Sequence, residues 1–343
     1  MSTTLSFEQL CEKVQAILEH AGLNKAQAQA VATVIAKGER DACKAHGVYR
    51  IEGVLRTFKA GKVRGDAIPT IAAADDSAII RIDGQSGFSL PAFDLGLPLL
   101  VEKARQLGLA AMVINDCTHF SALWPEVEAI TDQGLAAMVM CPSYATVAPW
   151  GGTKPLFGTN PFAFGWPRQH AEPYVFDFAT SVAARGEIEL YRRDGKQLPQ
   201  GWAIDDQGQP TTAPDAALAG AMLPFGGYKG SAMSTMIELL AGVMIGDLTS
   251  TGALDALGTT AFSPAHGELI IAMSPERFSD CRPGDPFARA EILFEAIEGQ
   301  GARLPSQRRF AARRTAQAQG IVLTDAEMQQ LDRLLDLGLE AID

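Results

Sequence analysis

Apolar residues recur every three or four positions near the start of the chain, which predicts an amphipathic helix. The residues on this face are Leu10, Val14, Ile17 and Leu18. A glycine-containing break at residues 22–24 ends this helix, and a second helix follows over residues 26–42. We expect the two helices to pack on elements that come later in the chain.

Short apolar runs then alternate with helical segments, a pattern that predicts an α/β fold. The predicted strands cover residues 78–84, 110–114, 135–141, 174–181 and 266–273. The predicted helices cover residues 55–62, 95–107, 231–245, 287–297 and 325–339. Gly108 stands where a helix C-cap is expected.

Two segments fit neither pattern. Residues 149–164 are rich in glycine and proline but too apolar for a solvated linker, so we expect an ordered loop against a ligand or a partner subunit. Residues 194–214 are polar and rich in turn formers, and we expect them on the surface.

Composition places the chain among globular proteins. Its 343 residues suffice for two domains or one large α/β unit, and 47% are hydrophobic and 20% charged. The formal net charge of −11 argues against a nucleic-acid or anionic-membrane surface, because both need a broad positive field.

The cysteines and histidines carry no metal-binding pattern. The five cysteines are scattered without a CxxC pair, and the five histidines form no HExxH motif, so we expect reduced thiols and no metal site. No apolar run is long enough for a membrane span, and the first residues lack the pattern of a signal peptide. We therefore expect a cytoplasmic protein.

His46 and Arg50 are the first candidates for catalysis. If residues 41–53 are helical, these two side chains project from the same face. A guanidinium binds a carboxylate through two parallel hydrogen bonds, and an imidazole can supply a proton during hydride transfer. The pair suits a substrate with a carboxylate beside a reducible C=O or C=N bond. A solvated helix face is the alternative.

Two further candidates lie where predicted strands end, which is where α/β proteins often place chemistry. His119 follows the strand at residues 110–114, and it either contacts a ligand or caps the following helix. Asp177 lies near the end of the strand at residues 174–181, and it either holds a ribose hydroxyl or caps the next helix.

Two stretches are suited to anions. The glycine-rich turn at residues 226–230 contains Lys229 and leads into a helix, which favours phosphate binding. It is not a Walker A loop, and no GxGxxG follows a strand, so a nucleotide is not expected to bind in the Rossmann manner. Five arginines within residues 303–314 either grip a phosphate, such as the 2′-phosphate of NADP, or begin a solvated basic helix.

Taken together, these stretches resemble the malate/L-lactate dehydrogenase type-2 family of NAD(P)-dependent oxidoreductases over nearly the whole chain. Six motifs carry the resemblance, in the family order: AHGVYRIEG, HFSALWPEVE, PLFGTNPFAFGWP, VFDFATS, LPFGGYKGS and RLPSQRR. Within the family, the HFSALWPE motif is most similar to that of the Δ1-piperideine-2-carboxylate/Δ1-pyrroline-2-carboxylate reductases.

The resemblance implies an α/β fold with a non-Rossmann NAD(P)-binding domain, built on a mostly antiparallel sheet surrounded by helices. The implied NADPH-binding domain is residues 126–285. Residues 1–125 and 286–343 would form a helical or mixed second domain for substrate binding and dimerisation. The implied partners are a small imino or oxo acid and a second copy of the chain in a homodimer.

The implied activity is the NADPH-dependent reduction of cyclic ketimine acids. The alternatives are a 2-hydroxyacid dehydrogenase of the malate/L-lactate type and a cofactor-binding homologue without activity. Carried over by motif, the catalytic residues are His46 and Glu187, and the substrate-binding residues are Arg50 and Thr159. The implied cofactor-binding residues are His119, Phe120, Ser121, Ala122, Leu123, Asp177, Phe178, Ala179, Arg185, Gly186, Tyr228, Lys229, Arg303, Leu304, Pro305, Ser306, Gln307, Arg308 and Arg309.

Three positions depart from the reductase pattern. A serine precedes the catalytic histidine in these reductases, where this chain has Ala45. An aspartate stands at the position of Glu187, and a histidine is common at that of Tyr228. Alanine has no side-chain donor or acceptor, so a three-residue relay through position 45 is excluded. Glu187 keeps a carboxylate that can orient His46.

Overall fold

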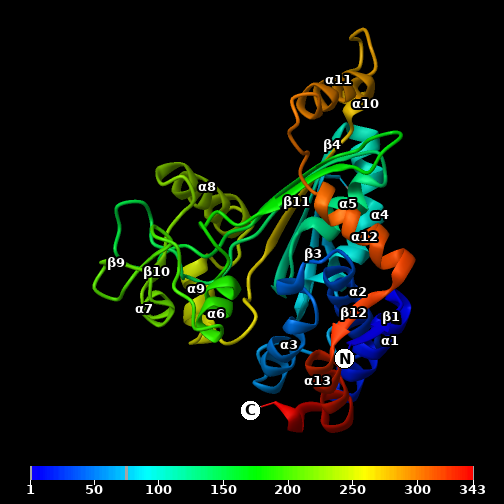
Figure 1. The fold of residues 1–343 in the computed structure, drawn as a ribbon. Helices are drawn as coiled ribbons and strands as arrows, with labels where there is room; N and C mark the ends of the chain where they lie inside the picture. Colours follow the sequence, from blue (N-terminus) through cyan, green and yellow to red (C-terminus); the bar gives the residue numbers. More distant parts are fainter. Residues whose placement is uncertain (1, 74–75, 343) are drawn as a thin grey trace.

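A seven-stranded sheet runs through the centre of the computed structural model, which describes residues 2–73 and 76–342 (Figure 1). Its strand order is β2-β3-β4-β11-β5-β6-β7. The strands are β2 (Thr70–Ala73), β3 (Ile79–Phe88), β4 (Leu109–Thr118), β5 (Ala136–Met140), β6 (Phe162–Trp166), β7 (Tyr174–Phe178) and β11 (Glu268–Met273). Within it β3 and β4 are parallel and the other neighbours are antiparallel. The predicted α/β class is confirmed, with a mixed and mostly antiparallel sheet.

Helices cover both faces of this sheet. On one face α4 (Ser89–Leu107) and α5 (Trp124–Thr131) bury Leu100 and Val127 against Met112 and Ile270. On the other face α8 (Tyr228–Glu238) continues into the π-helix η3 (Leu239–Val243) and packs on β4, β5 and β11. Burial on two faces explains why the central strands read as continuous apolar runs.

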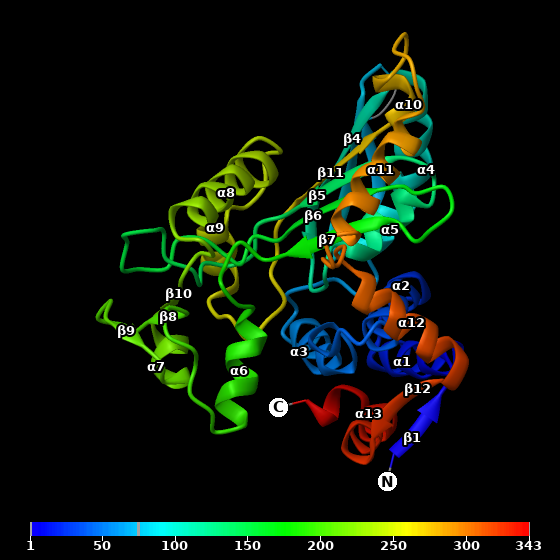
Figure 2. The ribbon, with the colours of Figure 1, turned by 45° about the horizontal axis from the view of Figure 1, so that its top comes forward.

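The two ends of the chain meet beneath the sheet (Figure 2). Here α1 (Phe7–Ala21), α2 (Lys25–Arg40), α3 (Ile51–Lys59) and α13 (Asp325–Leu337) share one apolar core. The strand β1 (Ser2–Leu5) pairs antiparallel with β12 (Ile321–Thr324). Ser6 and Thr324 each form a capping box that starts the following helix. The predicted N-terminal helix pair is confirmed.

A second lobe lies beside the sheet in both views (Figures 1 and 2). It contains α6 (Arg185–Arg193), α7 (Pro214–Ala219), α8 and α9 (Ser250–Leu257). It also contains a small sheet of order β10-β8-β9, formed by β8 (Ala203–Ile204), β9 (Pro210–Thr211) and β10 (Ala221–Met222). The segment expected on the surface at residues 194–214 contributes β8 and β9.

The remaining helices follow β11 and lead back to the terminal helices. They are α10 (Pro275–Phe278), α11 (Pro286–Glu298) and α12 (Gln307–Gln319). The central sheet draws strands from both sides of residue 125, so the proposed division at that residue stays a prediction. Within the described ranges, no helix is long and apolar enough to cross a membrane.

Several boundaries differ from the predicted ones. The strand β3 extends beyond residue 84 through two positive-φ residues, Gln85 and Ser86, and the strand at residues 174–181 stops at Phe178. The loop predicted at 149–164 ends in β6, which begins at Phe162. The helix predicted from residue 231 begins at Tyr228, because the turn before it uses positive φ at Gly226 and Gly227.

Candidate active site

The segment that carries His46 and Arg50 is not the continuous helix that their spacing suggested. It consists of two 3₁₀ turns, Lys44–His46 and Val48–Arg50, and α3 begins only at Ile51. Gly47 separates the turns with φ −90° and ψ −146°, outside the helical region. The turns still fold back on each other, because Arg50 Nε donates a hydrogen bond to the Ala45 carbonyl at 2.7 Å.

The side chain of Glu39 fixes this double turn through two contacts. This side chain is 1% exposed, its Oε1 accepts the Val48 N–H at 2.9 Å, and its other oxygen pairs with Lys44. The turn packs so closely that a Cβ on Gly47 would lie 2.0 Å from Glu39 Oε1. A Cβ on Gly38 would lie 2.5 Å from the His46 carbonyl oxygen. Glycine at both positions is therefore a packing requirement.

His46 is neutral at physiological pH in this environment. Burial lowers its pKa to about 3, and the positive charges of Arg50 and His119 contribute. Its Nδ1 is buried without a hydrogen-bond partner. A neutral imidazole retains one nitrogen that donates and one that accepts a hydrogen bond.

Arg50 provides a cation at the same place. Burial lowers its pKa, and the hydroxyls of Tyr144 and Tyr49 act in the opposite direction. In the described part of the chain its Nε is committed to Ala45, and no hydrogen bond occupies its two terminal nitrogens. Those two nitrogens can receive a carboxylate.

Tyr144 was missed by the sequence analysis. It lies in the loop after β5, and burial raises the pKa of its phenol although Arg50 and Arg185 oppose the shift. Its position after a buried strand was the signal that could have identified it, as it did His119. The phenol therefore remains a neutral hydrogen-bonding group near the guanidinium.

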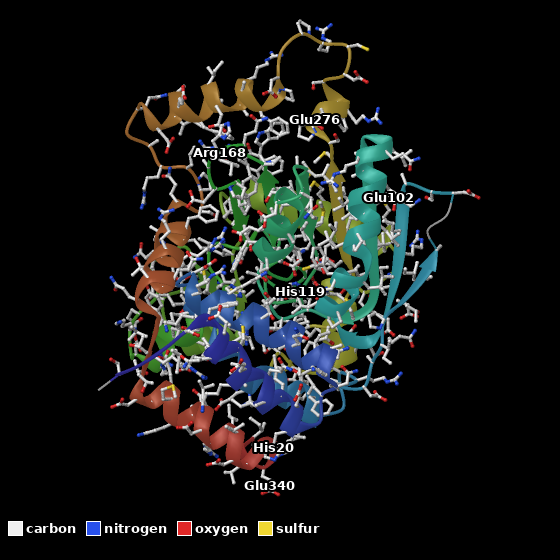
Figure 3. All side chains as sticks on the ribbon, turned by 90° about the vertical axis from the view of Figure 1, so that its right-hand side faces the viewer. His20, Glu102, His119, Arg168, Glu276 and Glu340 are labelled. Carbon is white, nitrogen blue, oxygen red and sulfur yellow. The ribbon has the colours of Figure 1, made fainter. Side chains whose placement is uncertain are left out.

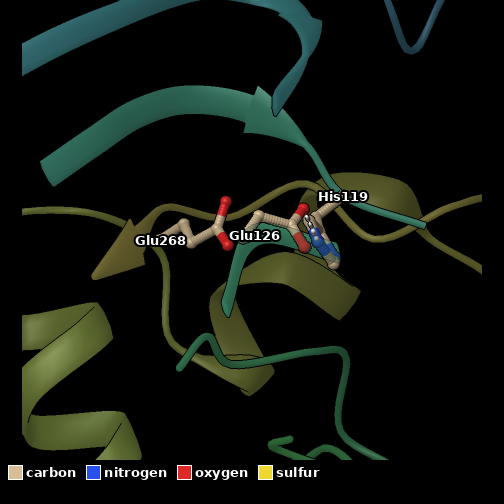
Figure 4. Close-up of side chains that lie close together, drawn as sticks. All are labelled: His119, Glu126 and Glu268. Atoms are coloured by element: carbon tan, nitrogen blue, oxygen red, sulfur yellow. Dashed lines mark ion pairs between the residues drawn. The ribbon is translucent and has the colours of Figure 1, made fainter. Parts of the chain in front are cut away.

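His119 lies deep in the sheet core, where it forms a cluster with Glu126 and Glu268 (Figures 3 and 4). Its Nε2 is 3.8 Å from Glu126 Oε1. It does not cap α5, because the N-cap residue of that helix is Leu123. The capping alternative is therefore wrong. Glu126 and Glu268 were also missed by the sequence analysis, since nothing local marks a glutamate as buried.

Asp177 caps an earlier helix rather than the following one. Its Oδ2 accepts the N–H groups of Leu123 at 2.8 Å and Trp124 at 3.0 Å, at the start of α5. The next helix, α6, follows Ala184 without a side-chain cap, so the prediction that Asp177 caps it is wrong. Burial raises the pKa of Asp177 to about 6, although the two N–H groups favour its ionised form.

The loop of residues 119–123, called here the 119–123 loop, is therefore anchored by Asp177 at one end and by the cluster at the other. All five of its residues are buried, including Phe120, Ser121, Ala122 and Leu123. Phe120 packs edge-on against Phe88, with ring centroids 5.7 Å apart. This part of the candidate site is rigid before any ligand arrives.

Thr159 is also held by its neighbours. Its carbonyl oxygen accepts the Thr180 N–H at 2.8 Å. The adjacent Asn160, at φ 37°, is fully buried and donates to Glu238 Oε1 at 2.8 Å. These bonds anchor the glycine- and proline-rich segment that was predicted to face a ligand.

The turn before α8 satisfies part of its own backbone, because the N–H groups of Lys229 and Gly230 donate to the Gly226 and Phe225 carbonyls at 3.4 and 3.0 Å. Its N-cap is Gly227, which leaves the first N–H groups of the helix without a side-chain cap. Tyr228 and Lys229 at this end are exposed. A Cβ on Gly227 would lie 3.2 Å from the Trp150 ring, so the indole closes one side of the turn.

The role of Glu187 toward His46 stays a prediction. Glu187 lies in the first turn of α6 with an exposed side chain, and no hydrogen bond or ion pair joins it to His46 in the described residues. In the same turn Arg185 donates to Thr260 Oγ1 at 3.1 Å, and a Cβ on Gly186 would meet no atom.

The arginine motif divides into buried and exposed members. Arg309 is 7% exposed, pairs with Asp41 and Glu128, and lies 4.2 Å from the Trp124 ring centroid. Arg313 pairs with the same two carboxylates. Arg303 and Arg308 are exposed. The helix start is thus only partly solvated, and Arg309 has protein partners.

The other predicted cofactor residues lie around these elements. Ser306 donates from its hydroxyl to the Val175 carbonyl at 2.6 Å, which ties the start of α12 to β7. The remaining ones are Phe178 at the end of β7, Ala179 directly after it, Leu304 and Pro305 before α12, and Gln307 at its start.

The site thus combines a partly buried guanidinium and a neutral imidazole, on an α/β framework with a mostly antiparallel sheet. The family model for malate/L-lactate dehydrogenase matches residues 5–332. The chain therefore belongs to the malate/L-lactate dehydrogenase family.

Within this family, the chain is similar to named reductases. It is 68% identical over 341 residues to the Δ1-pyrroline-2-carboxylate reductase of Agrobacterium fabrum, covering 99% of each chain. It is 52% identical over 332 residues to the Δ1-pyrroline-2-carboxylate/Δ1-piperideine-2-carboxylate reductase of Pseudomonas aeruginosa, covering 97% of this chain and 99% of the other. A solved structure, the Δ1-piperideine-2-carboxylate reductase of Pseudomonas syringae pvar. tomato, matches with a TM-score of 0.92 and 40% identity, covering 97% and 99%.

Proposed function

We propose that the chain is an NADPH-dependent reductase of cyclic ketimine acids, which converts Δ1-piperideine-2-carboxylate to L-pipecolate and Δ1-pyrroline-2-carboxylate to L-proline. The carrying observation is Arg50, a partly buried guanidinium with two uncommitted nitrogens in the described residues, close to a neutral His46. The names of the similar reductases support the same substrate class.

The neutral state of His46 favours an imine over a ketone. Reduction of a ketone requires a proton for the oxygen that becomes a hydroxyl. A cyclic imine can bind already protonated, as an iminium, and then carries the proton that its nitrogen keeps. Neutral His46 can accept a hydrogen bond from that N–H, while the two nitrogens of Arg50 hold the carboxylate.

Bound NADPH would supply the hydride that reaches C2 of the iminium, and the electron pair of the C=N bond would return to nitrogen. The protein contributes position and electrostatics. The buried 119–123 loop, the uncapped start of α8 and the exposed Lys229 are suited to a phosphate-bearing cofactor, which supports a nicotinamide dinucleotide held without a Rossmann fold. Arg303 and Arg308 support the choice of NADPH over NADH, because both are exposed cations.

The first test is NADPH oxidation with Δ1-piperideine-2-carboxylate, Δ1-pyrroline-2-carboxylate, pyruvate and oxaloacetate, repeated with NADH. We expect turnover of the two imines with NADPH. Turnover of the oxo acids alone would instead identify a 2-hydroxyacid dehydrogenase, and cofactor binding without any turnover would identify a non-catalytic homologue.

The same proposal includes a cytoplasmic homodimer with residues 126–285 as the NADPH-binding domain. The five cysteines are free thiols, as expected in a reducing compartment. Exposed apolar side chains on α8 and η3 support a second copy of the chain as partner: Met236, Leu239, Val243 and Met244. Light scattering on the purified protein tests the dimer, since a monomeric mass at working concentration would exclude it.

A further inference from the structure

Three ionisable side chains from separate elements meet in the sheet core. His119 follows β4, Glu126 lies in α5 and Glu268 begins β11 (Figure 4). Their side-chain donor and acceptor atoms lie within 4.8 Å of one another, and the residues are 3%, 1% and 0% exposed. His119 Nε2 and all four glutamate oxygens are buried without a hydrogen-bond partner. Burying two unpaired carboxylates is costly, so something must neutralise them.

The charges of the three side chains show how much positive charge would neutralise the cluster. Two carboxylates and one imidazolium sum to a charge of −1, and one further positive charge makes the cluster neutral. A metal ion finds only three protein ligands here, one fewer than a structural zinc site uses. The ring of His266 is 6.1 Å from that of His119, and its Nδ1 lies 2.9 Å from the Gly267 carbonyl oxygen. A single proton supplies the missing positive charge and, unlike a metal ion, requires no additional protein ligand.

We propose that Glu126 and Glu268 hold one proton between them, and that this pair with His119 as an imidazolium forms a neutral buried cluster that positions the 119–123 loop. Glu126 is the ionised partner, because it faces His119 at 3.8 Å. Glu268 carries the proton.

The electrostatics of each group agree with this assignment. Burial raises the pKa of Glu268 to about 8, where His119 opposes the shift and Glu126 adds to it. Burial alone would lower the pKa of His119, but a negative charge on Glu268, and after it the hydrogen bond and charge of Glu126, outweigh burial and raise this pKa.

The other ionisable groups near the cluster do not supply the missing positive charge. His46 and His266 are neutral, since burial lowers their pKa values to about 3 and about 4. Burial also keeps the thiols of Cys117 and Cys141 protonated, because it raises the pKa of each. Asp177, whose pKa is raised to about 6, adds negative charge that Arg309 opposes. Asp94 also faces Glu126, and burial raises the pKa of its carboxyl.

The shared proton links stability to pH. The folded protein keeps a proton on Glu268 that an unfolded chain loses near the ordinary glutamate pKa of 4.5. Between about pH 4.5 and about pH 8, the contribution of this one proton to the unfolding equilibrium constant therefore rises with pH, by up to about tenfold for each pH unit. Glu268→Gln carries a neutral side chain of the same shape at every pH and removes this contribution.

The effect on the cofactor rests on the proposed function, because it assumes that the 119–123 loop contacts NADPH. Glu126→Gln removes the carboxylate that faces His119 Nε2 at 3.8 Å, so the 119–123 loop loses one anchor. We expect the Michaelis constant for NADPH to rise more than that for the imine.

The test compares the unmodified protein with Glu268→Gln, Glu126→Gln and the control Glu102→Gln, whose side chain is exposed on α4 (Figure 3). In urea unfolding, the stability of the unmodified protein relative to Glu268→Gln should fall between about pH 6 and about pH 8, whereas its stability relative to Glu102→Gln should not change with pH. Infrared difference spectra should show a protonated carboxyl band that titrates near pH 8 and is missing from Glu268→Gln.

These two readouts need neither substrate nor turnover, so they stand even if the proposed function fails. If a variant does not fold, the infrared titration of the unmodified protein still tests whether a carboxyl group in the folded protein keeps its proton at neutral pH. Absence of the carboxyl band at neutral pH would overturn the proposal. So would an equal pH dependence in Glu268→Gln, or a stoichiometric divalent metal in elemental analysis of the purified protein.

Discussion

Glu39 accepts the backbone N–H of Val48 at 2.9 Å, across the double turn that carries His46. The same carboxylate pairs with Lys44, so it holds both sides of the histidine. Ala45 has no side-chain hydrogen-bonding group. The backbone on both sides of His46 is therefore fixed by Glu39.

Replacing this carboxylate should impair turnover more than binding. In Glu39→Gln the pair with Lys44 is lost and the turn can shift. We expect kcat to fall by up to about 100-fold, since a displacement of about 1 Å can have that effect. The Michaelis constant for NADPH should change little. Steady-state kinetics with the imine measures both, and Glu12→Gln, exposed on α1, serves as the control. A fall in cofactor affinity with no change in kcat would contradict the role of Glu39 in orienting His46.

Arg50 is predicted to bind the substrate carboxylate through two parallel bonds. Arg50→Lys keeps the charge but loses the fork. We expect the Michaelis constant for the imine to rise about 10- to 100-fold, because charge-assisted hydrogen bonds contribute about 1.5–3 kcal/mol. Arg56→Lys, in the helix α3 that follows Arg50, is the matched control. An unchanged constant would remove Arg50 from the substrate site.

The low pKa of His46 predicts a loss of stability in acid. The folded-state pKa of about 3 is below the ordinary histidine value of 6.5, so the unfolded chain binds more protons between these values. The free energy of unfolding should therefore fall as the pH is lowered through this range, by at most about 1.4 kcal/mol for each pH unit from this group. Urea unfolding at several pH values should show a shallower dependence in His46→Gln. An identical dependence would mean that His46 is not neutral in the folded protein.

Two neighbouring arginines should behave differently. Arg309→Ala leaves Asp41 and Glu128 short of one cation, and we expect a loss of about 3–5 kcal/mol in the free energy of unfolding. Arg308→Ala should leave stability unchanged and reduce the preference for NADPH over NADH. Denaturant unfolding and the ratio of kcat/KM for the two cofactors measure these effects. Equal losses of stability in both variants would contradict the assignment of a structural role to Arg309 and of a cofactor-binding role to Arg308.

The sequence located most elements because their signals are local. The periodicity of α1 and the apolar run of β5 depend only on neighbouring residues, and both elements lie where they were predicted. The double turn around His46 was not recognised, because it depends on Glu39 and on the contacts of Gly38 and Gly47. A spacing of four residues cannot distinguish a helix from two turns that are held by a distant side chain.

By itself, the sequence determined the α/β class, the motifs of the family and the candidates His46, Arg50 and His119. Only the tertiary structure decided their states: which arginine is buried, which helix Asp177 caps, and that His119 meets Glu126 and Glu268. The reason is physical. Motifs and periodicity are properties of adjacent residues, whereas burial and charge pairing arise between segments that are far apart in the chain and meet only when it folds.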